Sequence, residues 1–537
     1  MSHSRLSRGT GRRWVPAVAR TTAAIALAAL IGACSASTNS GSGGQGAGAS
    51  HTLHTAFSFD QGSLDPDIFY DAEGLSVTLA VYQGLLQYAN NSTPTLEPAL
   101  AQSWTESSDG LTYTFHLRPH VLFHDGTPMT SSSWKFDFQR RTGVNGGPAY
   151  MVAEVASMST PDPLTFVVHL KKPVSAFLNY MASPYGPKAI SPAAIKAHKT
   201  AKEPWAQTWL ANHEAGTGPY TLSSVVPGQS YVMTAYPKYW GPKPYYTTVD
   251  ISQIPSFSTQ ELELRSGQLN VMLHGVLPAD LSQFQNNSSF QIQQFPSIVR
   301  LNLWINPHLA PFTSQAVRLA AAQAINRQKI IPEVFHNTAT VANQMYTLGA
   351  LPAGTGTFNP TFDPSKLKAL ASSLPSKHVD LAYTTDDPVN AQVATLVAQD
   401  LDAAGLKVTT RGVTEATTFA WPTHPAGRAN MLILPANPDD ADASAWATLF
   451  YAEGGGLSYF EPNVTAADNQ INLGLHSVQK NTILAHYTTA ANLYRESGDF
   501  IPLADEKEVA VAQSGITGWS HDFSTLWTVR LWDLKAK

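Results

Sequence analysis

The alternation of apolar and polar residues predicts several short strands along this chain. A period of two, which is typical of half-buried strands, recurs over 53–57, 111–124, 164–170 and 249–254. Pro119 divides the second of these ranges, and because proline cannot donate a hydrogen bond to a sheet, we expect two short strands there. Ordered structure is therefore expected to begin near residue 53.

Helical periodicity is clearest over 314–335, where apolar residues favour one side. A second helix, predicted at 390–404 and ended by Gly405, lies between strand-like segments at 379–383 and 406–408. A strand, a helix and a strand in this order form a β-α-β unit with parallel strands. The fold class is therefore α/β, and because about 500 residues exceed what one hydrophobic core usually supports, two or three lobes are expected. Further helices are predicted at 74–86 and 480–496.

The N-terminal residues follow a different pattern. Five arginines precede the apolar run 21–33, then comes Cys34, and residues 35–50 are almost wholly small and polar. A basic start, a short apolar core and small residues before the cut are typical of a secretory signal peptide, which we place at 1–33. Residues 34–50 are predicted to be a flexible tether, because Gly and Ser bury little and lose much entropy on ordering.

Cys34, the only cysteine, ends the run Leu30-Ile31-Gly32-Ala33-Cys34, which resembles a bacterial lipobox. In a lipobox the cysteine thiol takes a diacylglycerol and becomes the mature N-terminus. The alternative, a buried structural cysteine, does not explain a position between an export signal and a tether. We therefore expect Cys34 to be lipidated, and two acyl chains would hold the protein stably to a membrane.

Charge and composition narrow the possible partners. The formal net charge of −5 becomes −10 once the five arginines of 1–33, a segment without acids, are removed. Nucleic acid is therefore not an expected partner, since binding it requires a basic surface. With no cysteine beyond Cys34 there is no disulfide framework and no thiolate metal site, and no cofactor is expected. No second long apolar run follows, so no membrane span is expected after processing.

The strongest motif is the stretch Glu214 to Leu222, EAGTGPYTL, in which Gly216 and Gly218 permit a tight turn and Pro219 begins the exit into a strand. Alone this is a hairpin. In order with other fragments it resembles the family 5 extracellular solute-binding proteins, the oligopeptide and dipeptide receptors of ABC importers. The matching fragments are SLDP at 63–66, YTFHLRPHVLFHDGTP at 113–128, LRSGQL at 264–269, PF at 311–312, AINR at 324–327, FDP at 362–364 and FIPL at 500–503.

The resemblance implies a type II periplasmic-binding-protein-like fold, with two α/β lobes joined by a hinge and an extra α/β domain inserted in the first. Ligand would be trapped between lobes that close by hinge motion. The implied domains are lobe 1 (51–90, 215–298 and 506–537), the inserted domain (91–214) and lobe 2 (299–505).

The resemblance also places ligand contacts. Residues just after SLDP line the cleft in the family's peptide receptors, which transfers to Tyr70, Asp71 and Ala72; Tyr150 would reach the cleft from the inserted domain. A solvated loop is the alternative for the first three. Trp421 is a candidate stacking platform, with a simple core tryptophan as its alternative.

The family's acid for the ligand amine corresponds to Asn437, and an amide cannot supply the charge-assisted bond that an ammonium prefers. Asp439, Asp440 or Asp442 would substitute if the loop is shifted by a residue or two, and an exposed acidic loop is the alternative. The expected ligand is a peptide; an oligosaccharide or a metal chelate remains open, because Asn437 weakens the expected amine site.

The expected role is therefore that of a lipid-anchored receptor on the outer face of the cytoplasmic membrane, or on the periplasmic side if an outer membrane exists. It would be a monomer that delivers ligand to an ABC permease. It is not expected to be an enzyme. A penicillin-binding hydrolase is the remote alternative, because Ser-x-x-Lys occurs at 132–135 and 365–368 without its companion motifs, and a protein-binding lipoprotein is another. A metal site at His116, His120 and His124 is disfavoured, because Pro119 argues against the helix that would align them.

Overall fold

The computed structural model describes residues 51–59, 62–90 and 94–537. The predicted signal peptide, Cys34 and the tether lie outside the described residues. Within these residues, no helix is both long and apolar enough to cross a membrane. Three larger sheets organise the described chain, and each has its own hydrophobic core.

The first of the two four-stranded sheets combines two segments that are far apart in sequence. Its edge strand pairs in parallel with the strand at 248–253, which the long intervening segment brings back beside it. The other pairings are antiparallel. In order across the sheet the strands are β1 (Thr52–Phe57), β10 (Thr248–Gln253), β9 (Ser230–Ala235) and β8 (Tyr220–Val226).

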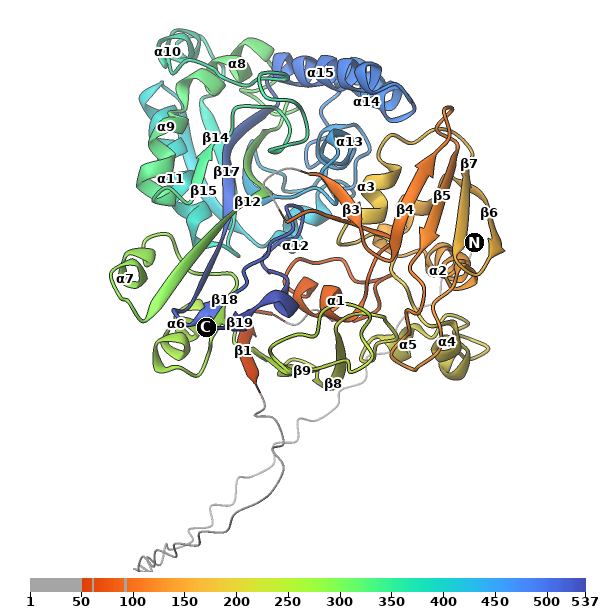
Figure 1. Cartoon of the computed structure of the whole chain (residues 1–537). Coiled ribbons are helices and arrows are strands. Elements are labelled where there is room, and N and C mark those ends of the chain that lie inside the picture. The colour runs from red at the N-terminus through yellow and green to blue at the C-terminus, as the bar shows by residue number, and fades with distance from the viewer. Residues whose placement is uncertain (1–50, 60–61, 91–93) are drawn as a thin grey trace, which may run out of the picture. The chain divides into compact units, whose positions relative to one another are not determined.

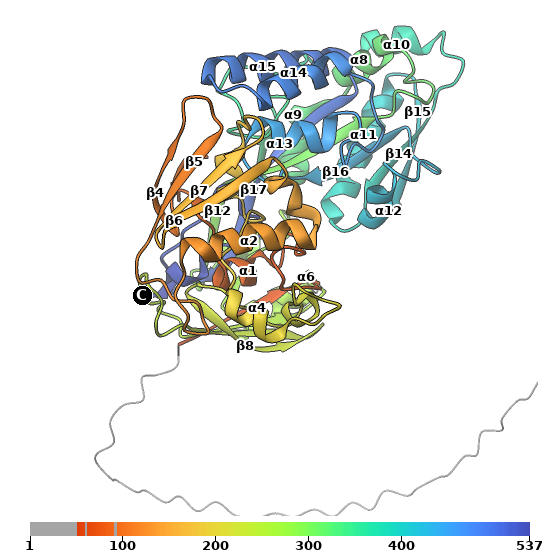
Figure 2. The ribbon, with the colours of Figure 1, turned by 90° about the vertical axis from the view of Figure 1, so that its right-hand side faces the viewer.

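The second four-stranded sheet is wholly antiparallel and packs its apolar face against a helix (Figure 2). Alternate residues of its central strands are buried, as the period-two pattern predicts. The strands in order are β4 (Ala101–Glu106), β5 (Thr112–Leu117), β7 (Thr165–Leu170) and β6 (Val155–Asp162), and the helix is α2 (Ser131–Val144).

The large sheet contains two long antiparallel strands, which run side by side in Figure 1. They are β12 (Phe290–Ile305) and β17 (Phe500–Gln513). A register shift between Pro296 and Arg300 interrupts their pairing. The predicted domain boundaries at 298/299 and 505/506 fall inside these two strands. The remaining strands are β11 (Val271–Met272), β13 (Ala339–Val341), β14 (His378–Thr384), β15 (Lys407–Val413) and β16 (Met431–Ala436).

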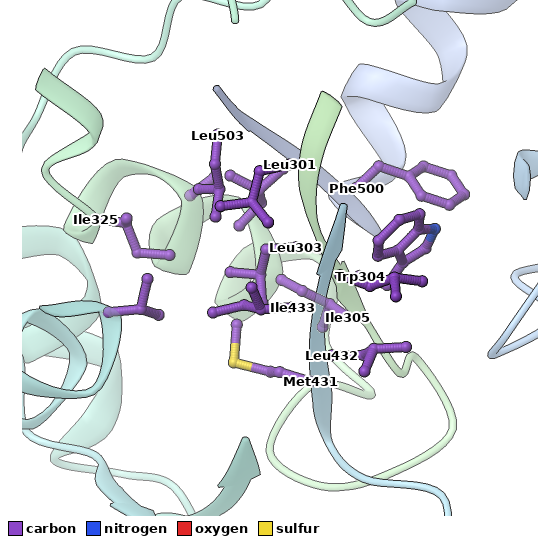
Figure 3. Packing of buried hydrophobic residues seen from close by; sticks show 14 of the residues in the cluster. Leu301, Leu303, Trp304, Ile305, Ile325, Met431, Leu432, Ile433, Phe500 and Leu503 are labelled. Carbon is purple, nitrogen blue, oxygen red and sulfur yellow. The ribbon is translucent and has the colours of Figure 1, made fainter. Parts of the chain in front are cut away.

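The core of the large sheet forms where apolar strand residues meet. Side chains from β12, β16 and β17 interdigitate there, among them Leu303, Ile433 and Leu503, each essentially inaccessible to solvent (Figure 3). The predicted β-α-β unit is present. Strands β14 and β15 pair in parallel, and the helix at 388–403 lies between them in the sequence.

The helices surround these sheets. In the first half of the chain they are α1 (Leu75–Val81), α3 (Phe177–Ala182), α4 (Pro192–His198), α5 (Gln207–Leu210), α6 (Phe257–Ser266) and α7 (Leu281–Gln285). In the second half they are α8 (Gln315–Ala324), α9 (Arg327–Ile330), α10 (Ser365–Ala371), α11 (Pro388–Ala403), α12 (Glu415–Ala420), α13 (Ala443–Trp446), α14 (Thr465–Leu475) and α15 (Lys480–Ser497).

Two sequence predictions of local structure are wrong in part. The single helix expected at 314–335 is interrupted, because Ile325 has an extended backbone and the Asn326 side chain caps the new helix by accepting from the Lys329 amide. The second strand expected after Pro119 does not form. His120 has a left-handed backbone (φ 61°) that turns the chain, and Leu122 makes only an isolated bridge to Pro128.

A buried cluster of four charges fastens the SLDP segment to α2. The Arg140 guanidinium binds both carboxylate oxygens of Asp65, at 2.7 and 2.6 Å, and reaches Asp67 at 2.5 Å. Arg141 Nε lies 2.9 Å from the other oxygen of Asp67. All four side chains are at most 2% exposed. Two arginines and two aspartates balance in charge, which makes burial of this cluster tolerable.

We predict that Arg140→Met strongly destabilises the protein, because it leaves Asp65 ionised, buried and without its bidentate partner. Removing one member of a buried pair typically lowers the free energy of unfolding by about 3–5 kcal/mol. Urea denaturation followed by tryptophan fluorescence measures this loss.

Lys172→Met is the matched control for Arg140→Met. It breaks an ion pair with Glu154 at 3.4 Å whose side chains are 46% and 34% exposed, and such pairs contribute less than about 1 kcal/mol. Equal midpoints for the two variants would contradict the structural role assigned to Arg140.

Candidate functional site

Two tyrosines and one aspartate that are far apart in sequence meet at one carboxylate. The Tyr70 hydroxyl donates to Oδ2 of Asp439, and the Tyr150 hydroxyl donates to the same oxygen at 2.6 Å. Tyr70 ends the SLDP loop, Tyr150 follows α2, and Asp439 follows β16. The structure therefore brings together three residues that the sequence predicted separately as ligand contacts. We call this group the tyrosine–carboxylate site.

Burial differs sharply among the three residues. Asp439 is only 5% exposed, whereas Tyr70 and Tyr150 are 42% and 43% exposed. Each tyrosine turns its hydroxyl inward to the acid and leaves part of its aromatic ring accessible. Exposed aromatic rings over a buried charge offer both stacking surface and electrostatic attraction to a ligand.

Close packing around two glycines sets the positions of both tyrosines. A Cβ on Gly146 would lie 2.1 Å from the carbonyl oxygen of Asp67, and one on Gly147 would lie 3.0 Å from the Tyr70 ring. The loop that leads to Tyr150 therefore approaches the SLDP segment more closely than any larger residue permits. Arg141 also donates to the carbonyl oxygen of Pro148, at 3.2 Å.

The Asp439 loop is pinned from the other side. Its carbonyl oxygen accepts from Ser183 Oγ at 2.5 Å. Asp440 accepts from the Asp442 amide at 2.8 Å, and Asp442 caps α13 by accepting from the Ser444 amide at 2.9 Å. The loop is therefore ordered by its own acids, which explains why three aspartates occur within four residues.

Burial raises the pKa of Asp439, and the hydrogen bonds from Tyr150 and Tyr70 offset part of this rise by stabilising the carboxylate. Burial together with the charge of Asp442 raises the pKa of Asp440 well above its ordinary value. Asp440 is fully buried, and its Oδ2 has no hydrogen-bond partner among the described residues. A desolvated carboxylate such as Asp439 favours a cation as its partner.

The other predicted contacts have varied surroundings. Asp71 accepts from the Gly74 amide at 3.1 Å, and its carbonyl oxygen accepts from the Tyr185 hydroxyl at 3.1 Å. Ala72 is half-buried and packs against the hydrophobic core of the β4-β5-β7-β6 sheet. Asn437 is also half-buried. The Asp439 carboxylate, two residues beyond Asn437, is the acid that meets Tyr70 and Tyr150.

Trp421 lies in the core and not at the tyrosine–carboxylate site. It is 2% exposed, and its ring stacks on Phe460 with centroids 5.8 Å apart. Its carbonyl oxygen accepts from Arg428 Nε at 2.9 Å. A buried ring has no free face for a ligand, so the structure favours the core alternative for Trp421.

Sequence reasoning missed two further tyrosines at the site. Tyr185 meets Tyr70 edge to face at 5.1 Å between centroids, and Tyr180 meets Tyr150 in the same way at 5.6 Å. Both belong to the segment that also supplies Ser183. The only available signal was the aromatic content of 177–185, which a core helix explains equally well.

The three spaced histidines do not converge. His116 and His120 are exposed. The His124 side chain is only 5% exposed, and it lies 2.6 Å from Glu214 Oε2 through Nδ1 and 3.0 Å from the carbonyl oxygen of Gly218 through Nε2. His124 therefore ties the FHDGTP segment to the GTGPY turn. No group of three or more potential metal ligands occurs in the part of the chain that the structure describes.

Comparison with solved structures defines the class of fold. The chain superposes on a Brucella suis NikA in complex with Fe(III)-EDTA with a TM-score of 0.80 at 22% identity, covering 90% of this chain and all of that one. A Helicobacter pylori DppA in complex with the peptide STSA gives 0.75 at 22% identity, covering 90% and 98%. The fold is that of a type II periplasmic binding protein.

Sequence comparison then gives the family. Residues 95–458 match the bacterial extracellular solute-binding proteins, family 5 middle, which is well over half of the chain. The chain is also similar to the probable D,D-dipeptide-binding periplasmic protein DdpA of Escherichia coli K12, at 28% identity over 369 residues, 67% of this chain and 69% of that protein. This chain therefore belongs to the family 5 extracellular solute-binding proteins, as its motifs predicted.

We predict that Tyr70→Phe combined with Tyr150→Phe raises the pKa of Asp439 further, because both hydroxyl donors that stabilise its carboxylate are lost. Carboxyl ¹³C chemical shifts during a pH titration report this pKa, and Asp439→Asn identifies the resonance. Tyr245→Phe, at a tyrosine 38% exposed and outside the site, is the control. An unchanged titration in the double variant would show that the hydroxyls do not support the charge.

Proposed function

We propose that this protein is the receptor of an ABC importer and captures peptides that carry a free amine at the tyrosine–carboxylate site. The observation that carries this proposal is the buried Asp439 carboxylate under two half-exposed tyrosine rings. A ligand ammonium would supply the missing positive charge, and the rings would pack against the adjoining peptide. Asp439 would then do the work of the acid that Asn437 replaces.

The site joins parts of the chain that hinge closure would bring together. Tyr70 belongs to the first-lobe segment, Tyr150 to the inserted domain and Asp439 to the second lobe. A ligand that bridges them would favour the closed form by its extra affinity for that form. In this role the protein makes and breaks no bond; it hands the ligand to a membrane permease, acts as a monomer and faces outward from the membrane.

A non-peptide solute is the second candidate. Asn437 provides an amide where the family's amine-binding acid is expected, and exposed tyrosine rings also stack on sugars. One structural neighbour is in complex with Fe(III)-EDTA. A peptide remains the better fit, because neither a neutral sugar nor an anionic chelate compensates the desolvated Asp439 carboxylate.

The proposal predicts that dipeptides or longer peptides raise the thermal midpoint, because a ligand bound only to the native state stabilises it. Libraries of peptides, N-acetylated peptides, oligosaccharides and metal chelates are compared by thermal shift. Stabilisation by peptides and not by their N-acetylated forms is the expected result. Stabilisation by a sugar or a chelate alone would overturn the peptide assignment.

Asp439→Asn tests the same proposal at the residue. It is expected to weaken binding by about 2–5 kcal/mol, roughly 30-fold or more, as for loss of one partner of a buried charge pair. In the unsubstituted protein the raised pKa of Asp439 means that affinity is full above this pKa and falls as the pH is lowered through it. Calorimetric titration should show this acid-side loss, and the variant should lack it.

The lipid anchor is tested separately. We predict that Cys34→Ser releases the protein into the soluble fraction, because no thiol remains to take the diacylglycerol. Fractionation of expressing cells, followed by immunoblotting of membranes and supernatant, measures the release. Ligand affinity should not change. Continued sedimentation of the variant with membranes would contradict the anchor.

A further inference from the structure

A small cavity is lined in part by residues of the turn that supports Asp439, and none of the residues of the tyrosine–carboxylate site lines it. Its volume is about 60 Å³. Its walls come from α1 and the residues after it, from the segment around 182–188, and from the C-terminal segment 522–532. Apolar side chains form much of the wall, and the charged groups are Lys188, Asp522 and Arg530.

Lys188 is a buried ammonium with too few partners. The residue is 4% exposed, and its Nζ donates to the carbonyl oxygen of Ser183 at 2.8 Å. An ammonium has three N–H donors, so this bond leaves two unused. No carboxylate forms an ion pair with Nζ within the described residues. A buried cation in this condition is costly unless a counter-charge reaches it.

The cavity wall carries two basic groups and one acid. Arg530 donates to the carbonyl oxygen of Tyr88 at 2.6 Å and forms an ion pair at 3.6 Å with Glu97, which is 37% exposed. Arg141 adds its positive charge to the surroundings of Lys188. The acid of the cavity wall is Asp522, one oxygen of which accepts from the Ser524 amide at 3.0 Å.

The titration behaviour agrees with this geometry. Burial lowers the pKa of Lys188 to about 7, the charge of Arg141 lowers it too, and Asp522 opposes them. Burial raises the pKa of Asp522 to about 6, against the stabilising charge of Arg530. For both groups, burial outweighs the effect of the opposite charge nearby. Below neutral pH the cavity gains positive charge as Lys188 takes up a proton and Asp522 becomes neutral.

We propose that this cavity binds a small monovalent anion, such as a halide, nitrate or formate, between the Lys188 ammonium and the Arg530 guanidinium. A volume of about 60 Å³ holds about two water-sized groups, which suits a small anion with one water and excludes a peptide or a sugar. The anion would accept the unused Nζ donors and compensate the buried charge. The site is independent of the proposed peptide ligand.

Anomalous diffraction locates such an anion directly. Crystals of the protein grown with sodium bromide should show an anomalous peak within hydrogen-bond distance of Lys188 Nζ. The same crystals of Lys188→Met, which keeps the length of the side chain and removes the charge, should lack it. No peak at Lys188 in the unsubstituted protein, where water alone fills the cavity, would overturn the proposal, as would a peak that persists in Lys188→Met.

Thermal stability gives a second measurement, which does not depend on crystals. Sodium chloride, nitrate or formate replaces sodium gluconate, whose anion is too large for the cavity, at constant ionic strength. A dissociation constant of about 10 mM would raise the midpoint by about 2 °C at about 100 mM anion. The rise should be larger below the pKa of Lys188 than above it.

Three variants separate this effect from general salt effects. Lys188→Met should lose the anion-dependent rise, and Asp522→Asn, which removes the opposing negative charge, should enlarge it. Lys172→Met, on the surface, should behave as the unsubstituted protein. The same rise in Lys188→Met as in Lys172→Met, or a smaller rise in Asp522→Asn, would overturn the proposal.

Discussion

The pairing of Asp65 and Asp67 with Arg140 and Arg141 is the constraint on which the site depends. Once Asp65 and Asp67 are buried, the SLDP loop can take only one position relative to α2, because any other leaves an ion without its partner. Tyr70 lies three residues beyond Asp67. The buried ion pairs of this cluster therefore fix the position of the half-exposed Tyr70 side chain.

The same arginines also place the two other parts that meet at Asp439. Arg141 donates to the carbonyl oxygens of Pro148, just before Tyr150, and of Tyr185 and Gly186, at 3.2, 2.8 and 3.0 Å. Unlike a side chain, a backbone carbonyl cannot rotate on its own, so each of these hydrogen bonds fixes the position of the main chain that accepts it. One guanidinium thus joins α2, the Tyr150 loop and the 183–188 turn, which fixes these three segments relative to one another.

Local patterns predicted much of the fold, and ordered fragments predicted the family, because both depend on residues near one another in sequence. The β-α-β unit around α11 is such a case. The interruption at Ile325 escaped prediction, because the apolar residues on both sides keep a helical period and only the Asn326 cap marks the break. Tyr70, Tyr150 and Asp439 were each named from the sequence as candidate ligand contacts. Their assembly was not predictable, because the hydrogen bonds to Asp439 span 369 and 289 residues.

The 183–188 turn connects two buried groups of opposite charge, the Asp439 carboxylate and the Lys188 ammonium. The Ser183 hydroxyl donates to the carbonyl oxygen of Asp439, and the Ser183 carbonyl oxygen accepts from Lys188 Nζ. Ser183 therefore contacts both the loop that carries the Asp439 carboxylate and the buried Lys188 ammonium. They do not neutralise each other, because no ion pair forms between them and burial shifts both toward their neutral forms. Each charge would be compensated by a partner from outside the chain, as we propose for both groups. Selection for stability alone would have paired or removed both charges, since unpaired buried ions lower the free energy of unfolding. Their retention on either side of a turn held by Arg141 therefore supports a binding role for this part of the molecule.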